Sequence, residues 1–65
     1  MAYRYYATMR PPAPGTIPLT PQPTRLRDYG RREDTGHGFA AWGYVEYPEP
    51  LTEGQAERYE LRRAK

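Results

Sequence analysis

Arginine and tyrosine are the residues of this sequence best suited to contact a partner. Nine of the ten basic residues are Arg, and seven of the 65 residues are Tyr. A guanidinium binds phosphate or carboxylate through paired hydrogen bonds and stacks on aromatic rings. Arg and aromatic residues are enriched at protein and nucleic-acid binding surfaces. These residue types predict a binding surface, whereas the net charge of +2 is too small to predict a nucleic-acid partner by itself.

Residues for catalysis are scarce. Ser and Cys are absent, which excludes a Ser-His-Asp triad and a thiolate nucleophile, and no glycine-rich phosphate loop is present. The single His lies between two glycines in a polar segment. We therefore expect a non-enzymatic protein without a cofactor or metal. A metal-dependent nuclease is a remote alternative, with the candidate ligands Asp28, Glu33, Asp34 and His37.

The segment Phe39–Tyr47 is expected to form the central strand. It contains the only Trp and the only Phe, and aromatic and β-branched residues favour strands. Alternation places Ala41 and Gly43 on one face, where we expect a helix to pack closely. Trp42 and Tyr44 share the other face, which is either a binding platform or a second hydrophobic layer covered by another segment or subunit.

Residues Ala2–Arg10 alternate with a period of two and predict a neighbouring strand. Its core face is expected to hold Tyr5, Ala7 and Met9, with Tyr3 at the edge. Its opposite face would carry Arg4, Tyr6, Thr8 and Arg10.

A proline-rich arm is predicted for residues 11–24, which hold six of the eight prolines. Proline lacks an amide proton, so neither a regular strand nor a helix crosses this stretch. Ile17 and Leu19 are expected to pin the arm to the sheet. The arm is either a linker or a docking segment for a partner.

The remaining segments predict a short strand, a loop and a helix. Arg25–Gly30 is expected to be the short strand, with Leu26 facing inward, and 31–38 a solvated loop. Thr52 and Gln55 form a capping-box pattern that predicts a helix over Glu53–Tyr59.

The last residues, 60–65, either extend this helix or return as a closing strand. We prefer the strand, with Leu61 inward. Residues 62–65, which include Arg62, Arg63 and Lys65, could instead fray as a flexible tail.

The predicted architecture is a single α+β domain over residues 1–65. It contains a small antiparallel sheet of three to four strands, one short helix and the proline-rich arm. A domain of this size buries only about 60 % of its unfolded surface. Because disulfides are excluded, we expect additional support from a homo-oligomer. No apolar run is long enough to span a membrane, and no signal-peptide core follows Met1, so we expect a cytoplasmic protein with no membrane partner.

Three segments carry a resemblance to known proteins: RYYATMRPPAPGTIP near the start, AWGYVEY in the middle, and PLT with YEL near the end. They cover about half of the chain. In these segments the sequence resembles a group of short bacterial proteins associated with prophages and other mobile elements. The resemblance implies a mobile-element setting and transfers no catalytic residues.

We first interpret the chain as a nucleic-acid-binding module, with DNA favoured over RNA. If the two main strands pair, one sheet face presents arginines for phosphates and aromatic rings on which bases stack, at about 1–3 kcal/mol per base. The residues predicted for this surface are Arg4, Tyr6, Arg10, Arg25, Arg27, Arg31, Arg32, Trp42 and Tyr44.

The alternative is a protein-binding inhibitor of a host defence system, similar in kind to anti-CRISPR counter-defence proteins. Small size, the resemblance, and the Tyr, Trp and Arg residues typical of interface hot spots support it. In this hypothesis acidic side chains could mimic phosphates, namely Asp28, Glu33, Asp34 and Glu46.

Overall fold

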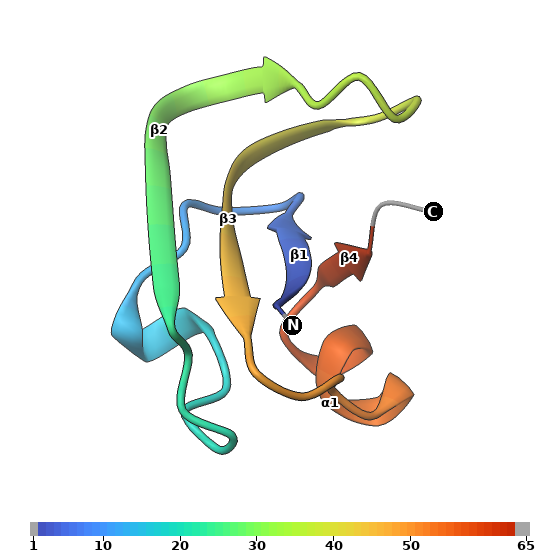
Figure 1. The fold of residues 1–65 in the computed structure, drawn as a ribbon. Coiled ribbons are helices and arrows are strands. Elements are labelled where there is room, and N and C mark those ends of the chain that lie inside the picture. Colours follow the sequence, from blue (N-terminus) through green and yellow to red (C-terminus); the bar gives the residue numbers. More distant parts are fainter. Residues whose placement is uncertain (1, 64–65) are drawn as a thin grey trace.

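The structure, a computed structural model, describes residues 2–63. The elements are β1 (Tyr3–Ala7), the 3-10 turn η1 (Pro14–Thr16), β2 (Arg25–Asp34), β3 (Ala40–Tyr47), α1 (Glu53–Arg58) and β4 (Leu61–Arg63). The four strands form one antiparallel sheet in the order β2-β3-β1-β4 (Figure 1). This confirms the predicted α+β class. None of the helices in this part of the chain has the length and apolar character needed to cross a membrane.

The Trp-bearing strand β3 lies inside the sheet, between β2 and β1, as predicted. Its register with β1 places Tyr5 opposite Val45 and Tyr3 opposite Tyr47. Tyr5, Val45 and Tyr47 are all buried, and the rings of Tyr5 and Tyr47 meet edge to face with centroids 6.0 Å apart. The core on this face is completed by Ala7, Ile17, Leu51 and Leu61.

Two buried tyrosine hydroxyls connect the irregular segments to this core. Tyr47 Oη donates a hydrogen bond to the carbonyl oxygen of Pro18 in the arm, at 2.7 Å. The amide of Leu51, just before α1, donates to Tyr5 Oη at 2.8 Å. A buried hydroxyl without a partner would be costly, so these bonds position both segments. Burial raises the pKa of Tyr47 to about 12.

Gly43 allows the arm and β2 to approach β3 closely. A Cβ built on Gly43 would overlap the carbonyl oxygen of Arg27 and lie 2.8 Å from the Pro12 ring. The prediction that a helix packs against Ala41 and Gly43 is therefore wrong, because Pro12 and the β2 backbone occupy that space. The helix α1 instead contacts β4.

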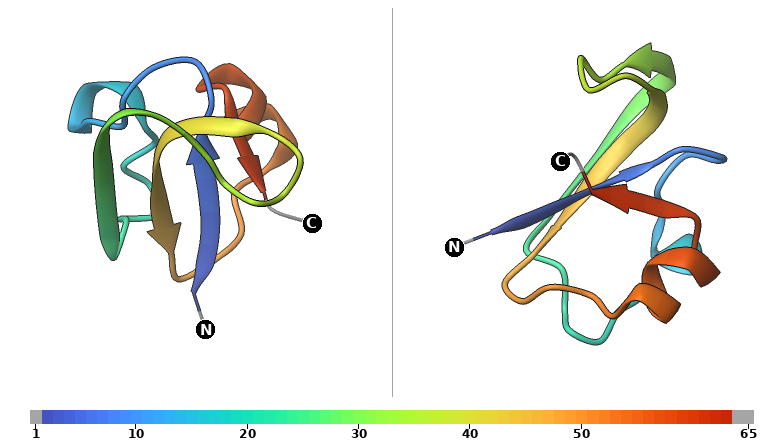
Figure 2. Two further views of the ribbon diagram at one scale, coloured as in Figure 1. Left: turned by 90° about the horizontal axis from the view of Figure 1, so that it is seen from above. Right: turned by 90° about the vertical axis from the view of Figure 1, so that its right-hand side faces the viewer.

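The capping box of α1 is confirmed. Thr52 Oγ1 accepts a hydrogen bond from the Gln55 amide at 3.1 Å, and Gln55 Oε1 accepts one from the Thr52 amide at 3.2 Å. After α1, Glu60 adopts a positive φ of 58° and turns the chain into β4. Figure 2 shows β4 beside β1, on the side of the sheet away from β2.

The closing strand with Leu61 inward is also confirmed. Arg62 and Arg63 do not form a frayed tail, because their backbone pairs with Tyr6 and Tyr5 of β1. Lys65 lies outside the described residues.

Three predictions about apolar side chains are wrong in whole or in part. Met9 is 62 % exposed rather than in the core, because β1 ends at Ala7 and the chain turns toward the arm. Leu26 does lie on the core face, opposite buried Val45, but it remains 39 % exposed because β2 is an edge strand. Leu19 is 56 % exposed and does not pin the arm, whereas Ile17 is buried as predicted and Pro18 is buried beside it.

The strand β2 is longer than predicted and is bent. It includes Arg31–Asp34, which we expected in a loop, and its register with β3 shifts between Asp28 and Glu33. Gly30 has a φ of 77° at this shift, and its amide donates to Asp28 Oδ1 at 2.8 Å. Figures 1 and 2 show the hairpin bending here, so that it crosses over β1 and its tip reaches the side of β4.

Replacing Gly43 should destabilise the fold more than replacing any exposed glycine. We expect Gly43→Ala to cost about 3 kcal/mol or more, because backbone and a proline ring must move. Gly54→Ala is the matched control, since Gly54 lies in α1 with open space around its Cα. It should stabilise the protein by about 0.5–1 kcal/mol. Urea unfolding measures both, and equal stability of Gly43→Ala and wild type would contradict this packing.

The stability of the protein should fall as the pH rises from about 10 to 12. The folded-state pKa of Tyr47 is raised above the ordinary value of 10.0. The unfolded state therefore loses its proton first, and the free energy of unfolding decreases across this window. Tyr47→Phe should remove this pH dependence. At neutral pH it should also lower the free energy of unfolding by about 1–2 kcal/mol, because the hydrogen bond to Pro18 is missing. Unfolding curves across the pH range that show the same slope for wild type and variant would contradict this.

Candidate functional site

The strand registers assemble two rows of side chains on the sheet face opposite the core. Residues directly opposite each other in an antiparallel sheet share a face. One row contains Arg25, Glu46 and Arg4, and the next contains Arg27, Tyr44, Tyr6 and Arg62. Trp42 joins them by alternation along β3. We call this set the arginine–aromatic face: Arg4, Tyr6, Arg25, Arg27, Trp42, Tyr44, Glu46 and Arg62.

Arg4 is held by a carboxylate and by a ring. Its Nε and Nη2 donate to Glu46 Oε2 at 2.8 and 2.6 Å. Its guanidinium carbon lies 3.9 Å from the centroid of the Tyr44 ring. The bond to Glu46 raises the pKa of Arg4, so it stays charged. The Arg4 side chain remains 42 % exposed, so it covers one side of Tyr44 while presenting a cation to solvent.

Tyr6 lies at the centre of an aromatic cluster and is only 5 % exposed. Its ring centroid is 5.7 Å from those of His37 and Phe39 and 6.2 Å from that of Tyr44. Tyr29 meets Tyr44 at 6.1 Å, and burial raises the pKa of Tyr29. The prediction that Tyr6 is available for base stacking is therefore wrong, because the bent hairpin tip covers it.

Arg62 was not among the predicted site residues. Its guanidinium carbon lies 4.3 Å from the centroid of Phe39, and its backbone pairs with Tyr6. The sequence signal for it was the alternation after Leu61: a strand that buries Leu61 directs Arg62 to the opposite face. We prefer a closing strand here from the sequence, but the predicted binding surface does not extend to it.

Six of the nine predicted residues come together on the arginine–aromatic face: Arg4, Tyr6, Arg25, Arg27, Trp42 and Tyr44. The other three lie elsewhere. Arg10 follows β1 and pairs with Glu60. Arg31 pairs with Glu33 at 2.9 Å, and neither Arg31 nor Arg32 has a cross-strand partner, because both lie in the bend of the hairpin.

The face is cationic, and two of its rings, those of Tyr6 and Tyr44, contact other side chains. It carries four arginines and one glutamate, and within residues 2–63 an ion pair is formed by Arg4 but not by Arg25, Arg27 or Arg62. Trp42 and Tyr44 are half-buried. Guanidinium groups in this state can bind carboxylates or phosphates. Tyr6 is too deeply buried for a base to stack on it, and Arg4 covers one side of Tyr44.

The candidate metal ligands are dispersed. Asp28 accepts from the Gly30 amide, and Asp34 accepts from the Gly36 amide at 2.9 Å. Glu33 is paired with Arg31. In the part of the chain that the structure covers, no three His, Asp or Glu side chains gather where they could hold a metal ion.

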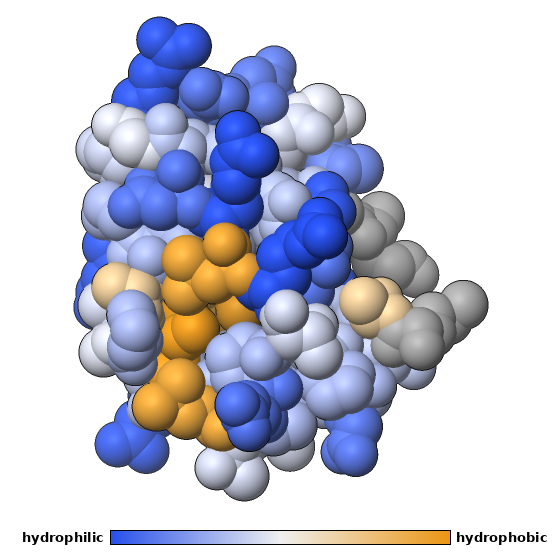
Figure 3. Space-filling view, turned by 60° about the vertical axis from the view of Figure 1, so that its left-hand side comes forward, coloured by the Kyte–Doolittle hydropathy of each residue, from blue (hydrophilic) through white to orange (hydrophobic). Residues whose placement is uncertain are grey.

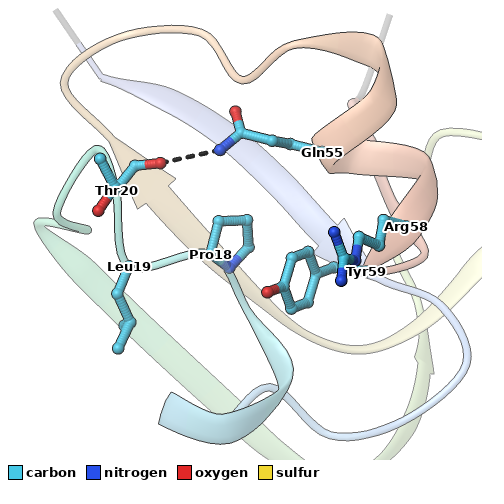
Figure 4. Close-up of a pocket in the computed structure, with 6 residues that line it drawn as sticks. All are labelled: Pro18, Leu19, Thr20, Gln55, Arg58 and Tyr59. Carbon is cyan, nitrogen blue, oxygen red and sulfur yellow. Dashed lines mark hydrogen bonds between the residues drawn. The ribbon is translucent and has the colours of Figure 1, made fainter.

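A shallow pocket of about 250 Å³ lies between the arm and α1, away from the predicted site residues. Figure 4 shows Tyr59 beside Pro18 and the hydrogen bond from Gln55 Nε2 to the carbonyl oxygen of Thr20, which measures 2.9 Å. This bond joins the arm to the helix, so the pocket lies where the arm contacts α1. Its lining residues are Pro18, Leu19, Thr20, Gln55, Arg58 and Tyr59.

Comparison with known proteins places the chain in a phage-associated family. Residues 1–65 match the family described as Defence against restriction A C-terminal. The chain is also 38 % identical over 66 residues to the Defense against restriction protein A of Escherichia phage P1, an alignment that covers 94 % of this chain and 9 % of that protein. No solved structure matches. The phage association implied by the sequence is confirmed, and the chain belongs to the Defence against restriction A C-terminal family.

Proposed function

We propose that the chain is a non-enzymatic, protein-binding module of phage counter-defence, and that it contributes to protection from restriction. The family and the name of the phage P1 relative support this proposal. The chain spans only 9 % of the length of that relative, so the function we propose for it is limited to one contact surface. The partner is a protein of the host restriction system.

The observation that carries the proposal is the pairing of arginines with rings on the arginine–aromatic face. Arg4 covers Tyr44 and Arg62 covers Phe39, while Tyr6 is buried beneath the hairpin tip. Pre-positioned guanidinium groups lose less conformational freedom when they bind carboxylates. Half-buried Trp42 and Tyr44 add contact area of the kind found in hot spots.

Nucleic-acid binding is the second candidate, supported by the four arginines on one face. Such binding would rely mainly on phosphate contacts, because Tyr6 is buried and Arg4 covers one side of Tyr44. Its affinity would therefore fall steeply with salt and show little preference among base sequences. The protein-binding proposal predicts weak binding to oligonucleotides and no dependence of protection on that binding.

Expression of the chain in a restricting host should raise the plating efficiency of unmodified phage. We expect Arg62→Glu to abolish this protection, because it reverses a charge on the arginine–aromatic face. Arg58→Glu is the control, since it makes the same change on the exposed side of α1. Thermal melting should show both variants folded. Equal loss in the two variants, or no protection by the wild-type chain, would contradict the proposal.

Fluorescence anisotropy with single- and double-stranded oligonucleotides separates the two candidates. For a protein-binding module we expect no saturable binding near physiological salt. Tight binding with a steep salt dependence, lost in Arg62→Glu but not in Arg58→Glu, would instead favour the nucleic-acid candidate.

A further inference from the structure

We propose that the free edge of β2, at Arg25–Asp28, takes up an extended protein segment as an added strand, and that this segment carries two carboxylates flanking one apolar residue. The inference rests on the proposed function, because it specifies the chemistry by which a protein partner is recognised.

The backbone of this edge strand is hydrogen-bonded to a neighbouring strand on one side only. β2 is the outermost strand, and residues 25–28 pair with β3 alone. Outside that ladder no backbone hydrogen bond within residues 2–63 involves these four residues. Alternate residues of an antiparallel strand direct their N–H and C=O groups away from the paired neighbour. These groups can therefore pair with an incoming strand.

The side chains along the edge define what that strand should carry. Arg25 and Arg27 are exposed, lie on the arginine–aromatic face and have no ion pair among residues 2–63. Leu26 points to the other side, and Leu19 of the arm is exposed too. Figure 3 shows an apolar patch on the side of the molecule where β2 comes forward. An added strand would place alternate residues beside the two arginines and the residue between them beside Leu26.

The inner neighbour of this segment already has part of that pattern. In β3, Glu46 lies opposite Arg25 and Val45 lies opposite Leu26. A partner strand with the order acidic, apolar, acidic would repeat this pairing on the outer side and add a carboxylate for Arg27. The occupant is therefore defined by charge as well as by shape.

A second copy of the chain does not fit this edge. Two copies related by a two-fold axis would pair this strand antiparallel with itself. Registers centred on residue 25 or 27 place that arginine opposite its own copy, and a register centred on 26 places Arg25 opposite Arg27. A register centred on residue 28 places Asp28 opposite Asp28. Like charges directly opposite each other are destabilising. Self-association stays a prediction, and this edge does not favour it.

A capped eight-residue peptide with a central Glu-Val-Glu tests the inference against the intact chain. Titrated into ¹⁵N-labelled protein, it should shift the amide signals of residues 25–28 saturably and slow the hydrogen exchange of the outward-facing amides. A peptide with Lys-Val-Lys at the same positions should not. Arg27→Glu should no longer bind the acidic peptide. Arg32→Glu makes an equal charge change in the bend of the same strand and should still bind it.

Absence of saturable shifts, shifts confined to other segments, or equal binding of both peptides would overturn the inference. The plating assay distinguishes a failure of this inference from a failure of the proposed function. If wild type and Arg27→Glu protect equally while Arg62→Glu does not protect, strand addition at this edge is wrong while the counter-defence proposal stands. If the acidic peptide binds selectively but wild type gives no protection, the edge is a peptide site and the counter-defence proposal fails.

Discussion

The hydrogen bonds of two buried tyrosines hold the irregular half of this chain against its sheet. Tyr47 reaches the carbonyl of Pro18, and the Leu51 amide reaches Tyr5. The sequence contains no Cys, so no disulfide can perform this task. Because both bonds point to the same side, the arm and α1 collect there. The opposite face of the sheet remains for the arginine–aromatic cluster, and close approach at Gly43 completes the arrangement.

One face of the sheet is thus covered, and the other is covered in part, by other segments of the chain. One face is covered by the core, and the other by the bent hairpin and by arginines lying on rings. The cover over Tyr6 comes from the hairpin tip, rather than from the proline-rich arm or a second subunit. The result is a cationic surface in which guanidinium groups pack on aromatic rings. Such a surface suits the carboxylates of the protein partner that we propose.

Features set by neighbouring residues could be predicted from the sequence, and features set by distant contacts could not. The central strand and the Thr52–Gln55 cap depend on local composition and spacing, and both are present. The bend in β2 depends on Gly30 and on packing of the tip against Tyr6, which no local pattern reveals. Six predicted surface residues converge because alternation fixes their face. The closing strand was predicted, but Arg62 was missed because its place beside Tyr6 depends on the long-range pairing of β4 with β1.

Proton NMR of the arginine side chains tests this account most directly. Arg4 lies 3.9 Å from the Tyr44 centroid and Arg62 lies 4.3 Å from the Phe39 centroid. Ring currents should therefore move their δ-methylene protons upfield of those of Arg32, which lies in the hairpin bend. Shifts for Arg4 and Arg62 equal to those of Arg32 would mean that the rings are uncovered, and would contradict the face on which the functional proposal depends.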